Sequence, residues 1–429
     1  MPAHAVLGAQ WGDEGKGKIV DFLAEDADIV ARFSGGNNAG HTVINDLGEF
    51  SLHLLPCGVF NENVTNIIGN GLVINPDILI YEINALNDVG IDISDRLIVS
   101  DRVHLILPHH VVLDNISEIK LGTDAIGTTG KGIGPAYGDK ISRKGIRAAD
   151  LLDIDTLKDR LITLVESSNL LIEKNNTQPQ LISVDELLEK CKIWAEKLHK
   201  YISPTGAYIN DQLSQGSNAV LEGAQGVLLD IDHGTFPYVT SSNSSIGGAI
   251  TGLSIQPRYL TSIVGVFKAY TTRVGAGPLP TELFDDVGES IRTIAREFGT
   301  TTGRARRVGW FDGVVAKYSH QVNGYTSAVI TRLDVLDQFE VVKICTGYEL
   351  DGQLIDHLPG GMAALSRCVP VYEELQGWDI PTAGMSDLNS LPKNARKYVD
   401  RIQEIIGIPI DIISTGPHRD ETITVRSLI

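Results

Sequence analysis

The sequence predicts an α/β fold with a central, mostly parallel β-sheet and helices on both faces of the sheet. Three observations predict this fold: a strand–loop–helix–strand unit at the start of the chain, short apolar strand candidates that recur along it, and helical segments between several of them. Strands of a parallel sheet are covered on both faces, so they appear as short continuous runs of aliphatic residues. The chain shows no repeat with a period of about 20 to 50 residues, which excludes solenoids and propellers.

The first unit sets this pattern. We expect a buried strand over Ala5 to Leu7, a helix over Lys16 to Glu25 with apolar residues three and four apart, and a strand over Ile29 to Phe33. The later strand candidates are similar apolar runs. They lie at Asn66 to Ile68, Leu97 to Val99, Ala219 to Leu221, Ser262 to Phe267, Ala328 to Thr331 and 409–413.

A more helical region covers about residues 155–202. It contains DTLKDRLITLVE and SVDELLEKCKIWAEKLHKYI, both with apolar residues at helical spacing. We therefore expect a helical insertion beside the sheet. The length of 429 residues alone permits one large domain or two or three ordinary ones.

The composition limits the kinds of partner. Lys and Arg total 36 against 54 for Asp and Glu, a formal charge of -18, and nucleic acids or anionic membranes require clustered positive charge. The N-terminus has no basic segment followed by an apolar one, and no apolar run approaches the length of a membrane span. The four cysteines lack metal-ligand spacing, which favours free thiols in a reducing compartment. We expect a cytoplasmic protein with no nucleic-acid or membrane partner.

The stretch QWGDEGKGKIV, residues 10–20, lies between the first strand and its helix, where a phosphate-binding loop is expected. The spacing of its glycines and its second lysine matches the common phosphate loop. Where that loop has a Ser or Thr hydroxyl for magnesium, this chain has Ile19. Two acids, Asp13 and Glu14, stand where a phosphate would lie.

These acids need an explanation, because a carboxylate about 4 Å from a phosphate charge costs about 4 kcal/mol at an effective dielectric constant of about 20. A cation or a proton transfer must compensate for this repulsion. Asp13 is then a magnesium ligand or a general base acting on a second substrate, and the two roles are compatible. Helix capping is the alternative for both acids, and it suits Glu14 better than Asp13.

A second glycine-rich loop, GGNNAGHT at 35–42, offers the amide of Asn38, the unhindered carbonyl of Gly40 and the imidazole of His41. A histidine in such a loop is by itself equally well structural. If His41 faces the bound phosphate, it donates a hydrogen bond to a transferring phosphoryl oxygen while Asp13 takes a proton from the nucleophile.

Three later stretches extend the site. TTGRARR, 301–307, places three arginines within four residues, which is typical of an anion grip; a solvated surface loop is the alternative. TRLD, 331–334, and STGP, 414–417, end predicted strands. An Asp at a strand end accepts two hydrogen bonds from the guanine edge, which adenine lacks, so the stretches together favour GTP over ATP.

QWGDEGKGK at 10–18 and GIGPAYGDKISR at 132–143 resemble the two signature segments of the adenylosuccinate synthetase family. The resemblance extends through NNAGHT, EGAQG, DIDHGTFPYVTSS, TTGRARR and STGP, and it covers essentially the whole chain. It implies the family's central, mostly parallel sheet, which is related to that of phosphate-loop NTPases. It also implies one domain over residues 1–429 with subdomains, in place of several independent domains.

The resemblance implies a GTP-dependent carbon–nitrogen ligase that forms adenylosuccinate from IMP and L-aspartate and releases GDP and phosphate, the committed step from IMP toward AMP. In the family's reaction a carboxylate takes the proton from N1 of IMP, the oxygen at position 6 attacks the γ-phosphoryl group of GTP, and aspartate displaces phosphate from 6-phosphoryl-IMP. Asp13 matches the base and a Mg²⁺ ligand, and Gly40 matches a second Mg²⁺ ligand through its carbonyl. His41 matches the group that assists phosphoryl transfer.

The resemblance also implies binding positions and a homodimer. IMP contacts fall on Asp13, Glu14, Gly15, Lys16, Asn38, Ala39, Gly40, His41, Thr129, Gln225, Thr240 and Arg304, and Arg143 reaches the IMP site of the neighbouring subunit. The loop over aspartate comprises Thr300, Thr301, Thr302, Gly303, Arg304, Ala305 and Arg306. GTP contacts fall on Gly12, Asp13, Glu14, Gly15, Lys16, Gly17, Lys18, Gly40, His41, Thr42, Arg306, Arg332, Leu333, Asp334, Ser414, Thr415 and Gly416. Family members commonly have Lys where this chain has Arg332, which also covers a purine ring but hydrogen-bonds differently.

A GTP-binding switch is the alternative function. A switch needs only the nucleotide loops, and Asp13, His41 and the IMP positions would have no use in it. Strict dependence of GTP cleavage on both IMP and aspartate distinguishes the ligase from the switch.

Overall fold

The structure is a computed structural model that describes residues 3–122, 126–175, 179–298 and 305–429. The strands of its central sheet are β1 (Ala3–Gly8), β2 (Ile29–Arg32), β5 (Thr65–Ile68), β7 (Leu97–Ser100), β9 (Ile202–Ser203), β10 (Ala219–Glu222), β11 (Leu260–Lys268), β15 (Ser327–Thr331), β19 (Ile410–Ser414) and β20 (Thr422–Thr424). Their order is β20-β19-β15-β11-β1-β10-β2-β5-β7-β9. All neighbouring pairs are parallel except β19 and β20. The predicted mostly parallel sheet is confirmed.

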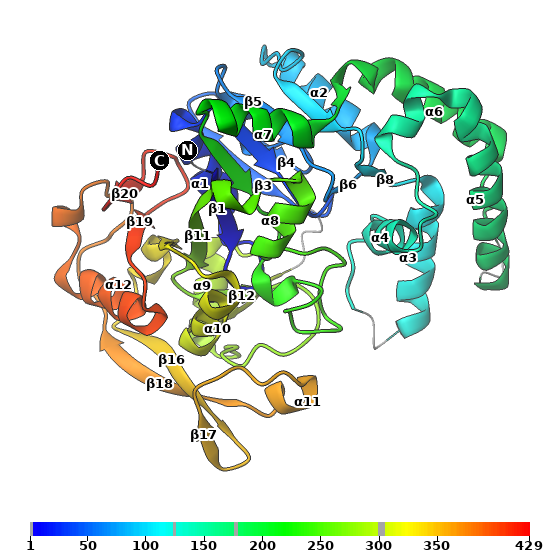
Figure 1. The fold of residues 1–429 in the computed structure, drawn as a ribbon. Helices are drawn as coiled ribbons and strands as arrows, with labels where there is room; N and C mark the ends of the chain where they lie inside the picture. The colour runs from blue at the N-terminus through cyan, green and yellow to red at the C-terminus, as the bar shows by residue number, and fades with distance from the viewer. Residues whose placement is uncertain (1–2, 123–125, 176–178, 299–304) are drawn as a thin grey trace.

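Helices cover both faces of this sheet (Figure 1). Successive side chains of a strand point to opposite faces, so Val6 packs in one buried cluster while Ala5 and Leu7 pack in the other. The cluster that contains Val6 also includes buried residues of four helices: α1 (Lys16–Leu23), α2 (Pro76–Asp88), α5 (Ile154–Asn175) and α6 (Val184–Leu198). The other cluster includes buried residues of five helices: α7 (Thr205–Gln215), α8 (Ile246–Leu253), α9 (Asp286–Ala295), α10 (Gly313–Asn323) and α12 (Lys393–Ile406).

The helical insertion expected over about 155–202 consists of α5 and α6, and the chain then enters the sheet as its edge strand β9. These helices stand with α3 (Pro108–Leu121) and α4 (Ile133–Ile141) to one side of the molecule (Figure 1). Among the helices of the described residues, none combines the length and apolar composition that a membrane span requires.

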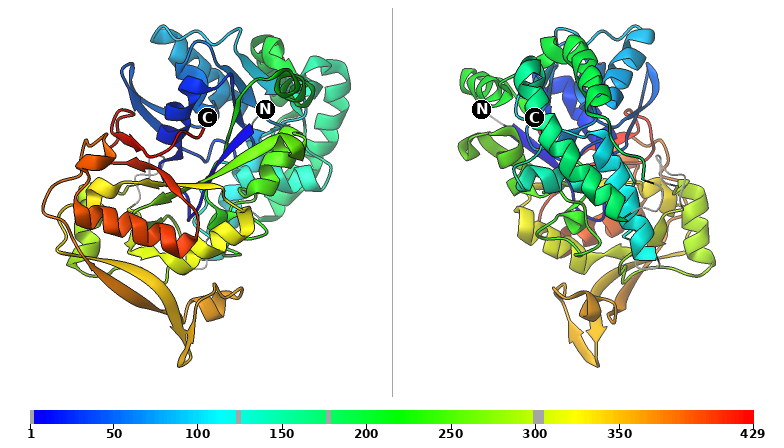
Figure 2. Two further views of the ribbon diagram at one scale, coloured as in Figure 1. Left: turned by 60° about the vertical axis from the view of Figure 1, so that its left-hand side comes forward. Right: turned by 90° about the vertical axis from the view of Figure 1, so that its right-hand side faces the viewer.

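Further strand pairs outside the central sheet, some antiparallel and some parallel, were not expected from the sequence. A long hairpin-like extension projects from the body of the molecule (Figures 1 and 2). It is built from β14 (Phe311–Asp312), β16 (Val341–Leu350), β17 (Gln353–Ile355) and β18 (Val369–Gln376), next to α11 (Met362–Leu365). Three smaller pairs are β3 (His41–Asn45) with β4 (Gly48–Leu52), β6 (Val73–Ile74) with β8 (His104–Leu105), and β12 (Thr271–Arg273) with β13 (Arg307–Gly309).

The sheet gathers the predicted loops at one edge. The carboxyl ends of parallel strands meet at the same edge of a sheet, and ligands bind there at the point where the strand order reverses. The central strand β1 is followed in the chain by α1 and β2, yet β10 and β11 are its neighbours in the sheet. The phosphate loop, GGNNAGHT, EGAQG, TRLD and STGP follow or end the strands β1, β2, β10, β15 and β19 in that order.

Candidate active site

The phosphate loop turns through left-handed backbone conformations. Gly12 has φ 84°, Asp13 has φ 59° and Gly15, the residue before α1, has φ 86°. Glycine and, less often, aspartate adopt this conformation. The Asp13 side chain remains 35% exposed, and its Oδ2 lies 2.6 Å from Nε of Arg306.

Glu14 has the opposite environment, because its side chain is completely buried. Its Oε1 accepts hydrogen bonds from the N–H groups of Gln10 (3.0 Å) and Gly12 (2.9 Å), and its Oε2 lies 2.6 Å from Nζ of Lys16. The residue that precedes α1 is Gly15, without a side-chain cap, and the first turn contains no acid. Helix capping by the two acids was therefore wrong: Glu14 instead fixes the loop from inside.

Lys18 is directed toward the C-terminal part of the chain. Its Nζ donates to Oγ of Ser414 (2.7 Å), the carbonyl of Gly416 (2.7 Å) and the carbonyl of Glu421 (2.8 Å). Burial lowers the pKa of Lys18 to about 8, against the opposing effect of the Glu421 charge. A lysine has three N–H donors, so this side chain joins α1 to the end of β19 and has no free donor for a phosphate.

The end of β15 also meets the phosphate loop. Thr331 Oγ1 donates a 2.6 Å hydrogen bond to the carbonyl of Glu14. Arg332 follows with φ 62° and donates to the carbonyl of Ala295 at 2.6 Å. Burial raises the pKa of Asp334, and its Oδ1 is buried without a hydrogen-bond partner among the described residues.

His41 forms a buried pair with Glu222, the last residue of β10. The Nδ1–Oε1 distance is 2.5 Å, and the side chains are 8% and 0% exposed. The other carboxylate oxygen of Glu222 accepts from the N–H of Cys57 at 2.7 Å. Burial opposes ionisation of Glu222, but the hydrogen bond and charge of His41, the charge of Arg32 and the Cys57 N–H lower its pKa. Burial lowers the pKa of His41 as well and outweighs the opposing effect of Glu222.

The loops after β2 and β10 present unpaired amide oxygens. Oδ1 of Asn38 and Oε1 of Gln225 are buried and have no partner within the described residues. A Cβ on Gly35 would lie 2.9 Å from Oε1 of Gln225, so the two loops are in close contact. The segment that precedes α4 contacts the loop after β2, since Nζ of Lys131 donates to the carbonyl of Asn37 at 2.7 Å.

The remaining predicted IMP positions differ in exposure. Thr129 is exposed, and Thr240 is half-buried with its hydroxyl 3.4 Å from that of Ser242. Arg143 is exposed and has φ 63°, just after α4. The neighbouring Ile141 is 79% exposed.

Of the predicted aspartate loop, Thr300, Thr301, Thr302, Gly303 and Arg304 lie outside the described residues. Its end is anchored, because Ala305 pairs with Phe298 and the N–H of Arg306 donates to the carbonyl of Glu297 at 2.9 Å. The Glu297 side chain, 2% exposed, binds Arg306 at 2.7 Å and Lys268 at 2.7 Å. Burial alone would raise the pKa of Glu297, but the Lys268 and Arg306 charges lower it to about 2.

Other predicted positions support this arrangement. Any Cβ on Gly17 would lie 3.0 Å from Cβ of His41 and from the carbonyl of Thr42, so only glycine fits without a shift. Leu333 is buried, and the hydroxyl of Thr415 donates to the carbonyl of Met385 at 2.6 Å. The structure therefore brings β1, β2, β10, β15 and β19 loops together around α1.

Sequence reasoning missed three charged residues of this region: Glu222, Glu297 and Lys268. Each is at least 97% buried as a side chain. Glu222 had a signal, because EGAQG places an acid at the end of an apolar strand candidate. Lys268 is likewise a charged residue at the end of a predicted apolar strand. The residues around Glu297 show no pattern that indicates a buried charge.

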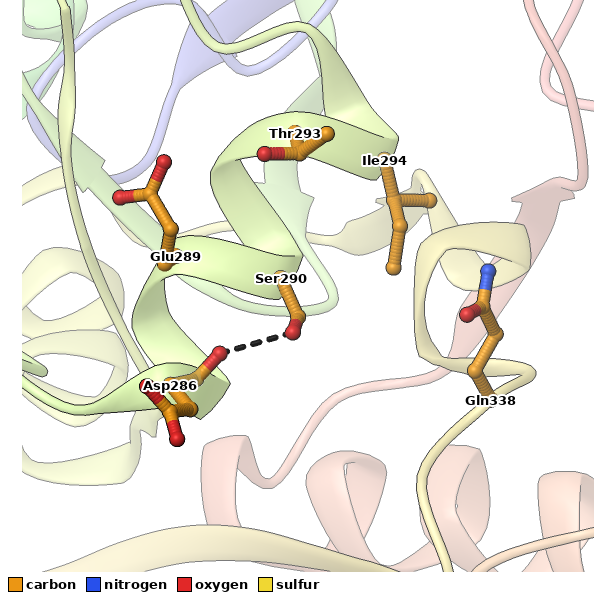
Figure 3. A pocket seen from close by; sticks show the side chains of 6 residues that line it. All are labelled: Asp286, Glu289, Ser290, Thr293, Ile294 and Gln338. Carbon is orange, nitrogen blue, oxygen red and sulfur yellow. Dashed lines mark hydrogen bonds between the residues drawn. The ribbon is translucent and has the colours of Figure 1, made fainter.

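A surface depression of about 430 Å³ lies elsewhere, along α9 (Figure 3). Asp286, Glu289, Ser290, Thr293 and Ile294 line it from the helix, and Gln338 lies opposite them. These side chains include no cation for a phosphate, and none is a predicted site residue. The loops at the strand ends are therefore the candidate active site.

Comparisons with known proteins agree with this geometry. The family profile described as "Adenylosuccinate synthetase" matches residues 5–423. The adenylosuccinate synthetases of Streptococcus gordonii and Streptococcus sanguinis are 48% and 49% identical to the chain over 428 residues, which covers 100% of this chain and 99% of each relative. The fully ligated adenylosuccinate synthetase of Plasmodium falciparum has a TM-score of 0.94 at 38% identity, covering 99% of this chain and 100% of that chain. A cyanophage S-2L succinoaminodeoxyadenylate synthetase, with a TM-score of 0.62 at 18% identity, is similar in fold alone.

This similarity extends far beyond the nucleotide loops that a GTP-binding switch would need. The predicted ligase is confirmed in preference to the switch. The chain belongs to the adenylosuccinate synthetase family, and it is a GTP-dependent ligase that forms adenylosuccinate from IMP and L-aspartate.

Proposed function

We propose that Asp13 is the general base that takes the proton from N1 of IMP. The observation that carries this proposal is the difference between the two acids of the phosphate loop. Glu14 is buried and hydrogen-bonded within the loop, whereas Asp13 is 35% exposed on the same strand-to-helix turn. An acid that the backbone holds in place and that stays open to a substrate is suited to proton transfer.

His41 has the complementary role of assisting transfer of the γ-phosphoryl group to the oxygen at position 6 of IMP. Its close packing against Gly17 sets the imidazole beside the first turn of α1, where backbone N–H groups without helical acceptors favour a phosphate. A protonated Nε2 donates a hydrogen bond to a phosphoryl oxygen as charge develops there. The aspartate amine then displaces phosphate from 6-phosphoryl-IMP.

Asp13 and Gly40 fit a Mg²⁺ ion. Mg²⁺ prefers oxygen ligands, and the two residues supply a partly exposed carboxylate and a half-buried backbone carbonyl. Ile19 offers no hydroxyl at the position where the common phosphate loop has one. The bound ion would neutralise part of the charge of the β- and γ-phosphates.

Asp334 selects guanine. Its buried Oδ1, which has no partner in the part of the chain that the structure describes, suits the N1–H and amino donors of guanine, because an unpaired buried acceptor costs about 1–3 kcal/mol. Arg332 is anchored on Ala295 through one nitrogen and keeps further donors for the nucleotide. The other GTP positions beyond the phosphate loop, Leu333, Ser414, Thr415 and Gly416, lie at the ends of β15 and β19.

IMP binds between the loops after β2 and β10, where the amide oxygens of Asn38 and Gln225 have no hydrogen-bond partner within the described residues. L-aspartate binds near Arg306, at the end of the segment 299–304. The exposed Arg143 beside the exposed Ile141 supports a homodimer in which this arginine reaches the partner's IMP. The four buried, free cysteines support a cytoplasmic location.

Phosphate release from GTP tests this proposal. We expect release only when IMP, L-aspartate and Mg²⁺ are all present. Arg143→Leu should raise the KM for IMP, and mixing it with inactive Asp13→Ala should restore part of the activity, because a mixed dimer contains one intact site. Mixtures that stay inactive would argue against a site shared between subunits.

A further inference from the structure

The turn that carries Arg143 closes on the backbone of Asp139, in the last turn of α4. The carbonyl of Asp139 accepts from the N–H groups of Lys144 at 2.9 Å and Gly145 at 3.2 Å. Arg143 lies within this turn with φ 63° and an exposed side chain. A residue other than glycine keeps such a left-handed conformation only where the surrounding structure imposes it. The direction of the Arg143 side chain therefore depends on the contacts that hold the turn.

The Asp139 side chain meets two buried histidines at the start of α3. Its Oδ2 lies 3.1 Å from Nε2 of His110 and 3.5 Å from Nε2 of His109, and the two imidazoles are 1% and 0% exposed. The centroids of these rings are 4.0 Å apart, so a single carboxylate oxygen faces both of them. This contact joins the end of α4 to the start of α3.

The backbone before α3 sets the direction of the hydrogen bond. Nδ1 of His110 accepts from the N–H of Leu107 at 2.9 Å, and burial lowers the pKa of His110 to about 4 although Asp139 opposes this effect. A neutral imidazole whose Nδ1 accepts carries its hydrogen on Nε2, which therefore donates to Asp139. The three side chains are close enough to be metal ligands, but Nε2 of His110 then has no free lone pair for a metal.

The other end of the turn is fixed by packing. Nη2 of Arg160, on α5, donates to the carbonyl of Gly145 at 2.8 Å. A Cβ on Gly145 would lie 2.5 Å from Nδ1 of His104, the first residue of β8, so the backbone is in close contact with that strand. Asp139 is thus the contact that fixes the turn at its α4 end.

We propose that Asp139, held by His109 and His110, is a positioning residue for the ligase reaction: it fixes the turn after α4 so that Arg143 reaches the IMP bound by the partner subunit. This inference rests on the role proposed above for Arg143. Because Asp139 acts through Arg143, its loss impairs the partner's IMP site and leaves the site of its own subunit intact.

Asp139→Ala removes the acceptor of both histidines. We expect the KM for IMP to rise about 10- to 100-fold with little change in kcat, because a displacement of about 1 Å in a group that positions a substrate costs up to about 10²-fold. Asp139→Asn should restore most of the affinity, since one amide oxygen in the place of Oδ2 accepts from both rings. An unchanged KM for IMP in Asp139→Ala would overturn the proposal.

Asp312→Ala is the matched control. Asp312 is also buried, and its carboxylate accepts from Oη of Tyr348 at 2.7 Å, but it lies in β14, beside the antiparallel extension. Its loss should lower the melting temperature and leave the KM for IMP unchanged. An equal rise of this KM in Asp312→Ala and Asp139→Ala would mean that general loss of stability causes it, against the proposal.

Mixed dimers test the proposal in a way that a merely structural role does not satisfy. Mixing Asp139→Ala with Asp13→Ala should restore activity at low IMP concentration, because one site of the mixed dimer combines an intact Asp13 with a correctly held Arg143 from the other subunit. Mixing Asp139→Ala with Arg143→Leu should restore nothing, since neither subunit then presents Arg143 correctly.

These mixtures also separate the two proposals. If Asp13→Ala rescues Arg143→Leu but not Asp139→Ala, only the present inference is refuted. If it rescues neither variant, the shared site of the proposed function is refuted too.

A measurement on the unaltered protein keeps the proposal testable if Asp139→Ala does not fold. In protein labelled with ¹⁵N-histidine, His110 should show a protonated Nε2 and an unprotonated Nδ1 at neutral pH. The opposite tautomer would place no donor toward Asp139 and would refute the proposal.

Discussion

The candidate active site contains two paired carboxylates with different environments. His41 and Glu222 are 8% and 0% exposed, and strand ends and a buried N–H hold them. Asp13 and Arg306 are 35% and 13% exposed, and they join the phosphate loop to the segment that begins at Ala305. The contacts are similar in length, 2.5 Å and 2.6 Å, so the difference lies in burial and anchoring.

This difference indicates that the two pairs have different roles. The strand ends hold the His41 pair in a fixed arrangement, which suits the role that we propose for His41 at a phosphoryl oxygen. The Asp13 pair is open to exchange, because its carboxylate is 35% exposed. We expect Arg306 to leave Asp13 when aspartate binds and to pair with the substrate carboxylate instead.

The largest effect should come from Asp13→Asn, which keeps the shape of the side chain and removes the base. Turnover should fall by about 10³-fold or more, because general-base catalysis contributes about 10²- to 10⁴-fold and the Mg²⁺ ligand is weakened at the same time. The melting temperature should stay close to that of the unaltered protein, since the Asp13 side chain is not part of a core. Near-normal phosphate release would mean that another group takes the proton.

His41→Asn should have the next largest effect, a fall in kcat of about 10²- to 10³-fold, as for other lost donors to a developing charge. In contrast to Asp13→Asn, it should also lower stability, because Glu222 loses the partner that favours its buried charge. Steady-state kinetics and thermal melting measured on both variants test this contrast. Equal stability of the two variants would contradict the difference in anchoring.

Glu297→Gln should act more weakly, through Arg306. Glu297 holds the guanidinium at 2.7 Å, so its loss should raise the KM for L-aspartate about 10-fold, the size of one weakened charge-assisted hydrogen bond of about 1.4 kcal/mol. Glu289→Gln is the control, because it removes the same charge from the exposed pair with Arg292. A KM for aspartate that is unchanged in Glu297→Gln would show that Arg306 is held without this carboxylate.

The smallest effect concerns stability at acid pH. The pKa of Glu297 is lowered from 4.5 to about 2 by Lys268 and Arg306, against the effect of burial. Ionised Glu297 therefore stabilises the fold fully above its unfolded pKa of about 4.5, and this contribution is lost as the pH falls toward 2. Denaturant unfolding between pH 6 and about 3 should show a shallower decline for Glu297→Gln than for the unaltered protein; parallel curves would exclude this linkage.

The local pattern of apolar residues was sufficient to predict most strands of the central sheet. The strands around Val6, Val30 and Val220 were predicted from short aliphatic runs, and each is buried on both faces. The helix after the phosphate loop was predicted to Glu25 but ends at Leu23, because the chain tightens into a 3-10 turn over Ala24–Asp26. The antiparallel extension of β16 and β18 was missed, since its strands have exposed faces and lack the continuous apolar run of a parallel strand.

Side-chain directions were harder to predict. The spacing of the phosphate loop suggested that Lys18 faces an anion, yet three acceptors at the far end of the chain hold it. Helix capping was expected to suit Glu14 better than Asp13, yet neither acid caps the helix. Burial by β15 and by the loop itself decides which of the two acids is open.

The sequence by itself determined most strands of the central sheet and the loops that carry glycines, acids and arginines, because these depend on residues close together in the chain. The tertiary structure decided which charges meet. His41 and Glu222 are 181 residues apart, and Lys18 and Ser414 are 396 apart. Only the parallel sheet brings such distant strand ends to one edge, and the burial created there sets which groups are ionised and which stay open to substrates.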